Sequence, residues 1–245
     1  MTAPLSTPAL EAQRSARRGR AAAFFDVDRT LLRGSSFLAL AGPLRRAGII
    51  SRRHLLGAAL HQVAFTLRGA SHEKLEDAGR AGADAVRGID AERLRSVTRD
   101  ALDTALLPRL HAGALRAIDA HHRAEEPVFL VSSAPVEIVE PLARAVGAAG
   151  FAATHAEIGS HGRYTGRLLD FCHGTRKYHA VHELAARHGI DLQRSHAYAD
   201  SFADAPMLGM VGHPVAVNPD KDLRALAVRR GWRIARYRSS STSRR

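Results

Sequence analysis

Two aspartates, Asp26 and Asp28, stand two residues apart at the end of the apolar run 21–25. Such a run, closed by residues that disfavour strands, is typical of a buried strand that opens into a loop. Side chains at positions i and i+2 of an extended chain point to the same side. Two like charges directed at one point are costly unless a cation or a shared proton lies there. The pair therefore predicts a site in which one aspartate acts as a nucleophile and the other as an acid or base, although a simple turn explains the pair taken alone.

Polar residues follow three other apolar runs in the same way. The runs cover residues 128–131, 196–199 and 214–217, and each is typical of a short buried strand. In a parallel α/β sheet the carboxyl ends of the strands share one edge, where ligands bind. The residues expected at this edge, beside the first aspartate pair, are Ser132, Ser133, Asp200, Asp204 and Asn218.

Helical patterns alternate with these strands, which predicts an α/β fold with a Rossmann-like parallel sheet. Residues 151–158 and 164–169 flank a His-Gly-Arg turn and predict a hairpin-like excursion, and a last strand is expected at 232–237. Gly189 marks one helix end and Asp220 caps another helix. The helices are expected at 110–122, 135–146, 176–188, 204–210 and 220–229.

Residues 36–106 contain no convincing strand and instead show helical apolar spacing. The spacing is clearest at Leu55, Ala58, Ala59 and Val63, and again at Leu94, Val97, Ala101 and Ala105. Breaks are expected at Gly42-Pro43, at residues 69–71 and at Gly88. The predicted organisation is a basic arm (1–20), a catalytic core (21–35 and 107–237), an all-helical insert (36–106) and a basic tail (238–245).

The composition is that of an ordinary soluble protein, with 45% hydrophobic and 24% charged residues among 245. Of the net charge of +12, residues 1–20 carry +3 and residues 233–245 carry +5, so the body carries only +4. The basic charge therefore does not predict specific nucleic-acid binding by the folded part, although basic tails suit RNA, anionic lipid or an acidic partner. The single cysteine, Cys172, and the lack of a long apolar stretch favour a cytoplasmic protein without a transmembrane span.

Four segments together resemble the motifs of the haloacid dehalogenase superfamily. The first, residues 26–30, resembles Asp-x-Asp-x-Thr, and the second, residues 128–132, is an apolar run ending in serine. Lys177 is placed like the lysine of the third motif, and residues 200–204 resemble Asp-Ser-x-x-Asp, the fourth. Four motifs in order over about residues 21–235 are far more specific than one. The helical insert between the first two is similar to the C1 cap of the phosphoserine-phosphatase-like branch, subfamily IB.

This resemblance implies an Mg²⁺-dependent phosphomonoester hydrolase that forms an aspartyl phosphate on a small phosphorylated substrate. Asp26 is then the nucleophile and Asp28 the general acid, and Mg²⁺ is held by Asp26, Asp200 and the backbone carbonyl of Asp28. Ser132, Lys177 and Thr30 would contact or orient the phosphoryl group and its loop. Asp204 and Asn218 are expected to lie behind the residues that bind the metal. The alternative role of Asp204 is to cap a helix, and that of Asn218 is to start a turn.

At two places that bear on the substrate, the sequence differs from the pattern of phosphoserine phosphatases. Phosphoserine phosphatases usually carry a glutamate shortly after the first motif, and here Ser35 stands at that place. The segment Ser132-Ser133-Ala134-Pro135 replaces their Ser-Gly-Gly. Loss of the acid removes the expected partner of a substrate ammonium group, so phosphoserine is disfavoured while phosphatase chemistry is kept.

Three other interpretations stay open at this level. A phosphotransferase would share all four motifs, and a lipid-phosphate phosphatase would suit an insert that contacts a membrane surface. A regulatory protein with a retained core and active basic tails is the non-enzymatic alternative. His179 and His182 lie one helical turn apart without an evident third ligand, so they are expected to be a surface pair.

Overall fold

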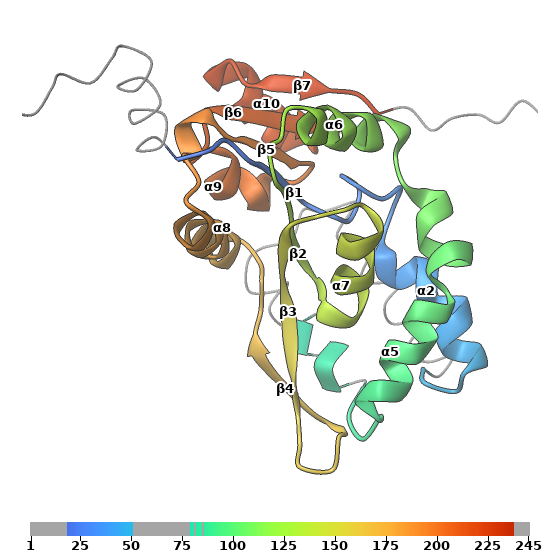
Figure 1. The fold of residues 1–245 in the computed structure, drawn as a ribbon. Coiled ribbons are helices and arrows are strands. Elements are labelled where there is room, and N and C mark those ends of the chain that lie inside the picture. Colours follow the sequence, from blue (N-terminus) through green and yellow to red (C-terminus); the bar gives the residue numbers. More distant parts are fainter. Residues whose placement is uncertain (1–18, 51–78, 81, 85, 238–245) are drawn as a thin grey trace, which may run out of the picture.

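The computed structural model describes residues 19–50 and 79–237, except residues 81 and 85. The apolar spacing at 55–63, the break at 69–71 and nearly all of the two basic ends lie outside the described residues. A mixed sheet crosses the centre of the molecule, and helices cover both of its faces (Figure 1). None of the described helices is both long and apolar enough to cross a membrane.

Seven strands form the sheet in the order β4-β3-β2-β1-β5-β6-β7. Each strand is parallel to its neighbours except β4, which pairs antiparallel with β3 as the hairpin pattern predicted. The short β1 lies at the centre, because the most apolar strand is the one that is buried on both faces. The strands are β1 (Ala23–Phe25), β2 (Val128–Pro135), β3 (Gly150–Ile158), β4 (Tyr164–Asp170), β5 (His196–Ala199), β6 (His213–Val217) and β7 (Arg233–Ala235).

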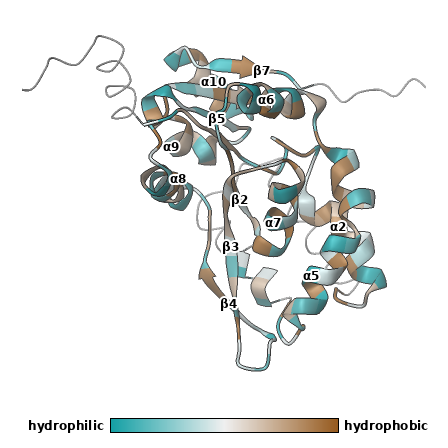
Figure 2. Ribbon diagram, in the orientation of Figure 1, coloured by the Kyte–Doolittle hydropathy of each residue, from teal (hydrophilic) through white to brown (hydrophobic). Residues whose placement is uncertain are grey.

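Two hydrophobic clusters, one on each face, hold helices against the sheet. Alternation along β1 sends Phe25 to the face covered by α6 and α7, and Phe24 to the face covered by α8, α9 and α10. Phe129 of β2 stacks on Phe24 with ring centroids 5.4 Å apart. Figure 2 shows the helices as teal and brown stripes, as expected for amphipathic helices on a sheet. The helices are α6 (Ala112–Arg123), α7 (Val136–Ala145), α8 (Thr175–His188), α9 (Ala205–Leu208) and α10 (Lys221–Arg230).

Helix ends lie where the local chemistry predicted them. Gly189 ends α8 in the left-handed conformation with φ of 63°, which glycine adopts without a steric cost. Asp220 caps α10 by accepting a hydrogen bond of 2.8 Å from the backbone N–H of Leu223.

Helical elements occupy the described part of the insert. They include α2 (Ser36–Arg46), α5 (Ala91–Asp100) and a π-helical turn (Leu102–Leu106), and a 3₁₀ turn (Leu107–Arg109) follows where the core resumes. The expected break at Gly42-Pro43 is wrong, because α2 continues through Pro43. Leu40 and Leu44 are buried on either side of the proline, and their packing outweighs the local cost of a proline inside the helix.

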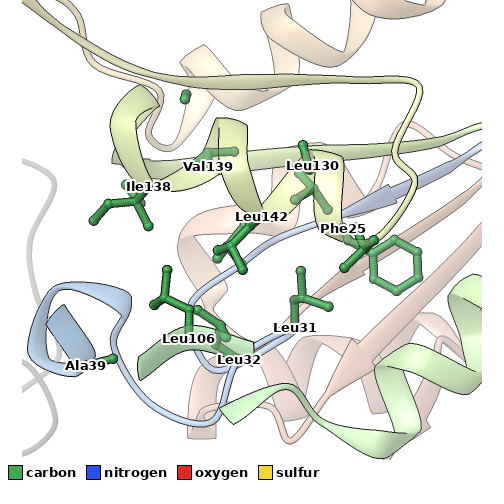
Figure 3. Close-up of a cluster of buried hydrophobic side chains, with 14 of the residues drawn as sticks. Phe25, Leu31, Leu32, Ala39, Leu106, Leu130, Ile138, Val139 and Leu142 are labelled. Atoms are coloured by element: carbon green, nitrogen blue, oxygen red, sulfur yellow. The ribbon is translucent and has the colours of Figure 1, made fainter. Parts of the chain in front are cut away.

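A single hydrophobic cluster joins the insert to the sheet. Ala39 of α2 and Leu106 of the π-helical turn belong to the same buried cluster as Leu130 of β2 and Leu142 of α7 (Figure 3). The insert therefore packs against the core next to β1 and β2.

The insert is also bonded to the β3–β4 hairpin through its backbone. The N–H of Gly88 donates to the carbonyl of Tyr164 at 2.8 Å, and the N–H of Tyr164 donates to the carbonyl of Ile89 at 3.0 Å. The N–H of Ala91, at the start of α5, donates to Gly162 at 2.9 Å. The segment before α5 thus runs along the start of β4 like a short extra strand.

Strand β2 is longer than the apolar run that predicted it. The run ends at Val131, but β2 continues through Ser132 and Ser133 to Pro135, with a shift of register against β3 in between. The hydroxyl of Thr154 on β3 donates a hydrogen bond of 2.8 Å to the carbonyl of Ser133. This bond from the neighbouring strand holds the polar end of β2 in an extended conformation.

We expect Leu130→Ala to lower the free energy of unfolding by about 2–5 kcal/mol, because it opens a cavity in the fully buried centre of the sheet. Leu169→Ala is the matched control, since Leu169 is 69% exposed on β4 and its loss should change stability by less than about 0.5 kcal/mol. Urea denaturation followed by circular dichroism measures both. Equal effects of the two substitutions would contradict the assignment of the core.

Candidate active site

Three neighbouring strands bring the predicted site residues to one edge of the sheet. Phe25 of β1 is paired with Leu130 of β2 and with Tyr198 of β5. Asp26 follows Phe25 directly, while Ser132 and Asp200 lie two residues beyond those partners. The backbone N–H of Asp26 donates to the carbonyl of Tyr198 at 2.9 Å, which fixes the start of the loop.

The loop after β1 folds back on itself in a tight turn. The carbonyl of Val27 accepts hydrogen bonds from the N–H groups of Leu31, at 3.0 Å, and Leu32, at 2.8 Å. Arg29 adopts φ of 63°, a left-handed conformation that is uncommon for residues other than glycine. This turn buries Thr30 and separates the side chains of Asp26 and Asp28 into different surroundings.

Lys177 forms the buried ionic centre of the site. Its ammonium Nζ lies 2.6 Å from Oδ1 of Asp26 and 3.0 Å from the carboxylate of Asp204. Only 2% of the lysine is exposed, so these contacts are shielded from water. Burial acts to lower the pKa of Lys177, but Asp204 and Asp26 outweigh it and raise the pKa. The lysine is therefore a permanent cation that holds the proposed nucleophile in place.

Asp200 faces the same centre from the end of β5. Its Oδ2 lies 2.9 Å from Nε of Arg29, and its Oδ1 accepts a long hydrogen bond of 3.4 Å from the hydroxyl of Thr30. Burial, followed by the nearby charge of Asp26, raises the pKa of Asp200 well above its ordinary value. Burial makes the ionised form of Asp200 costly, and the cations Arg29 and Lys177 only partly offset this cost.

Asp28 and Asp204 also have raised pKa values, in both cases mainly because the carboxyl group is buried. Burial raises the pKa of Asp28, and the backbone N–H of Ser36, which donates to its Oδ1 at 2.9 Å, partly offsets this. Burial likewise raises the pKa of Asp204 to about 6, against the lowering effect of Lys177. The raised pKa of Asp28 suits a carboxyl group that must hold and release a proton near neutral pH.

Asp220 braces the loop that carries Asp200 and Asp204. Its Oδ2 accepts a 2.8 Å hydrogen bond from the backbone N–H of Phe202, in addition to the cap bond that its Oδ1 makes to α10. Its own N–H donates to the carbonyl of Asp200 at 2.8 Å. The sequence predicted only the helix cap, yet the same carboxylate fixes the loop of the fourth motif.

Ser132 and Asn218 make different contacts from those of the acidic cluster. Ser132 is buried at the same strand edge, and its Oγ accepts a 3.1 Å hydrogen bond from the N–H of Ala134. The amide of Asn218 binds the C-terminal segment, with Nδ2 3.2 Å from the carbonyl of Tyr237 and Oδ1 3.0 Å from its N–H. In the structure Asn218 therefore anchors the chain after β7, while its role behind the metal ligands stays a prediction.

The structure adds two groups that sequence reasoning did not single out. Arg29, at the second variable position of the first motif, pairs with Asp200 as described above. Glu137 is buried in the first turn of α7, accepts a 2.5 Å hydrogen bond from the hydroxyl of Tyr164 and lies 3.9 Å from Arg95 of α5. A glutamate in a first helical turn is ordinary, so no sequence signal marked it.

The predicted surface pair on α8 is confirmed. His179 and His182 are both exposed, and the ring of Tyr178 packs against each of them. Cys172 is buried, and burial raises the pKa of its thiol to about 11, which keeps it protonated and unreactive near neutral pH.

The donor set of this edge fits Mg²⁺. Asp26, Asp200 and Asp204 are buried carboxyl groups, and Mg²⁺ prefers such hard oxygen ligands. Burial is the main cause of the raised pKa values of Asp200 and Asp204, and the nearby cations Lys177 and Arg29 only partly offset it. A divalent cation at this edge would supply further positive charge.

Comparison with known proteins identifies the family. The family described as haloacid dehalogenase-like hydrolase matches residues 23–209, which span the sheet strands and loops that carry the acidic cluster. The chain belongs to the haloacid dehalogenase-like hydrolases. It is therefore an enzyme of the hydrolase class, as the four motifs predicted.

Two relatives from Mycobacterium tuberculosis are similar over most of their length. The probable phosphatase Rv3661 is 38% identical over 223 residues, covering 91% of this chain and 77% of the relative. Phosphoserine phosphatase SerB1 is 39% identical over 220 residues, covering 89% of this chain and 71% of the relative. The resemblance to the phosphoserine-phosphatase-like branch is thereby confirmed.

Two solved structures share the fold. A protein of unknown function from Bordetella pertussis Tohama I superposes with a TM-score of 0.75 at 27% identity, covering 89% of this chain and 98% of its own. A phospho-aspartyl intermediate analogue of phosphoserine phosphatase gives a TM-score of 0.65 at 16% identity, covering 90% and 94%. The predicted Rossmann-like α/β fold is confirmed.

The raised pKa of Asp200 predicts a pH-dependent gain in stability for Asp200→Asn in the absence of divalent metal. Above about pH 4 the unfolded chain has released this proton while the folded protein still binds it, so stability falls as the pH rises, by up to about 1.4 kcal/mol per pH unit. The Asp200→Asn variant has no ionisable group at this position, so this fall in stability with rising pH is absent from it. Its stability relative to the native protein should therefore increase as the pH rises above about 4, as measured by urea unfolding in a chelator.

Asp119→Asn is the control, because Asp119 is exposed on α6. A stability difference for Asp200→Asn that stays constant, or that grows toward low pH, would contradict the electrostatic description of the site.

Proposed function

We propose that this protein is a Mg²⁺-dependent phosphomonoester hydrolase that works through a phosphorylated Asp26. The observation that carries the proposal is the buried contact of 2.6 Å between Asp26 and Lys177, beside Asp200. A carboxylate held by a permanent cation, next to oxygen ligands for a metal, suits attack on an anionic phosphate.

In the first step, a carboxylate oxygen of Asp26 attacks the phosphorus atom. The bond from phosphorus to the ester oxygen breaks, and the leaving alcohol takes a proton from Asp28. The raised pKa of Asp28 favours the protonated form that this step requires. Lys177 and the hydroxyl of Ser132 would stabilise the charge on the phosphoryl oxygens.

In the second step, Asp28 accepts a proton from a water molecule that attacks the aspartyl phosphate. Inorganic phosphate leaves, and both Asp26 and the protonated Asp28 are restored. The hydrogen bond from the N–H of Ser36 orients Asp28 at the start of α2, so the same carboxyl group serves in both steps.

Asp26, Asp200 and the backbone carbonyl of Asp28 would hold Mg²⁺, with Asp204 behind them. The metal, when bound, offsets repulsion between the anionic nucleophile and the anionic phosphate. Asp220 contributes by fixing the loop of Asp200 and Asp204 before any ligand binds.

The substrate is proposed to be a small phosphorylated molecule whose leaving group lies between the core and the insert. One relative is named a phosphoserine phosphatase, but Ser35 stands at the N-cap of α2 where those enzymes usually carry a glutamate. A phosphoester without a free ammonium group at this position is therefore favoured over phosphoserine. A hydrolase transfers the phosphoryl group to water, whereas a phosphotransferase would transfer it to an added alcohol, so measuring the two products distinguishes them. The cytoplasmic location stays a prediction.

Asp26→Asn should lower the turnover of an aryl phosphate by about 10³-fold or more, because the amide is a poor nucleophile. The exposed Asp119→Asn variant should keep full activity, and both variants should unfold cooperatively. Steady-state release of the phenol measures the effect. Undiminished metal-dependent turnover by Asp26→Asn would exclude the mechanism.

Removal of divalent metal should abolish hydrolysis, and added Mg²⁺ should restore it. The expected loss is at least about 10²-fold, since the metal neutralises charge that Lys177 and Arg29 only partly balance. Activity is assayed after treatment with a chelator and again after addition of excess Mg²⁺. Equal rates with and without metal would show that the carboxylates act without a cation.

A further inference from the structure

A second group of possible metal ligands lies at the amino ends of the strands, opposite the catalytic edge. It consists of His121 in the last turn of α6, Glu126 in the loop before β2, and His196, the first residue of β5. Nitrogen and carboxylate atoms of the three residues all lie within 4.8 Å of one another. Strand β5 runs from His196 to Ala199 before Asp200, so its length separates this group from the active site.

We propose that His121, Glu126 and His196 bind a divalent transition metal of the zinc type, as a structural site independent of catalysis. Two imidazole nitrogens and one carboxylate oxygen make up a donor set that Zn²⁺ accepts, and a fourth ligand would complete its tetrahedral coordination. Mg²⁺ prefers oxygen ligands and fits this set poorly. The two ends of the sheet would therefore select different metals.

The surroundings of His121 fix its ring in a manner that suits a ligand. The ring is buried, with Nε2 2.8 Å from the hydroxyl of Tyr198 and Nδ1 2.6 Å from Oε2 of Glu126. In metal sites the second ring nitrogen of a histidine is usually held by an oxygen partner, as Tyr198 holds Nε2 here. Nδ1 and the carboxylate of Glu126 are hydrogen-bonded to each other, and a bound metal would take the place of the proton between them.

A second feature that favours a bound metal is the ring of His196. Its Nδ1 is buried and has no hydrogen-bond partner among the described residues. Its ring stacks on that of His213 at 4.7 Å between centroids and lies 4.8 Å from the ring of His121. A buried polar atom without a partner costs free energy, and a metal bond at this nitrogen removes that cost.

The local field also favours a cation. His121 lies in the last turn of α6, where the carbonyl ends of the helix carry partial negative charge. Glu126 adds a full negative charge, and its backbone N–H donates to the carbonyl of His121 at 2.9 Å, which keeps the loop close to the helix end. His213 and Arg233 oppose a positive charge near His196, and Glu126 offsets them. A metal here would link the loop between α6 and β2 to the start of β5.

Zinc binding by the full chain tests the proposal. We use Asp200→Asn as the parent, so that the catalytic carboxylates compete less for the added Zn²⁺, and measure bound zinc by equilibrium dialysis with excess Mg²⁺. Adding His196→Gln should remove about one bound Zn²⁺ per chain, with at least a 100-fold loss of affinity. The matched control is His179→Gln, which removes an exposed histidine of α8 and should leave zinc binding unchanged.

Thermal unfolding provides a second readout. Zn²⁺ should raise the melting temperature of the parent and of His179→Gln, but not that of the His196→Gln variant. If His196→Gln fails to fold, Glu126→Gln replaces it, since Glu126 lies in a partly exposed loop and its amide keeps the shape of the side chain. Equal zinc binding by the parent and by either ligand variant overturns the proposal, as does a parent that binds no zinc. Aryl phosphate hydrolysis by His196→Gln in the native background should be unchanged, which separates this site from the proposed function.

Discussion

A buried ammonium group organises the active site of this hydrolase. Lys177 contacts Asp26 after β1 and Asp204 after β5, so one cation joins two loops that are far apart in sequence. Removing one partner of such a buried pair leaves an uncompensated charge, which is strongly destabilising. The lysine is itself supported by Gly174, whose φ of 54° lets α8 begin where its first turn reaches the sheet edge. Without this cation the carboxylates could not be buried together.

Burial of the other carboxyl groups of the site is unfavourable for their ionised forms. Burial raises the pKa of Asp28, Asp200 and Asp204, and Arg29 is drawn to Asp200 in a left-handed backbone conformation. Strain and raised pKa values gathered at one place are typical of a functional site. The insert contributes through the N–H of Ser36, so closure of α2 over the loop also sets the environment of Asp28.

Local patterns predicted most of the elements and the acidic residues of the site. Strand β5, the end of α8 at Gly189 and the cap of α10 at Asp220 follow from short-range chemistry, which a sequence displays directly. The predictions were wrong where contacts between distant parts of the chain determine the local structure. Packing of Leu40 and Leu44 carries α2 through Pro43, and the hydroxyl of Thr154 extends β2 past its apolar run. The pairing of Arg29 with Asp200 also depends on a fold that brings residues 29 and 200 together, which no local pattern contains.

The backbone bonds between the insert and the β3–β4 hairpin bear on how substrates enter. Gly88, Ile89 and Ala91 are bonded to Tyr164 and Gly162, and Arg95 faces Glu137 nearby. A rigid opening of the described part of the insert would have to break these bonds or carry the hairpin with it. On the side of α2, the contacts with the core among the described residues include hydrophobic packing and the bond from Ser36 to Asp28. A movement of α2 that broke this bond would also change the state of the carboxyl group beneath it, because the bond from Ser36 is among the contacts that lower the pKa of Asp28.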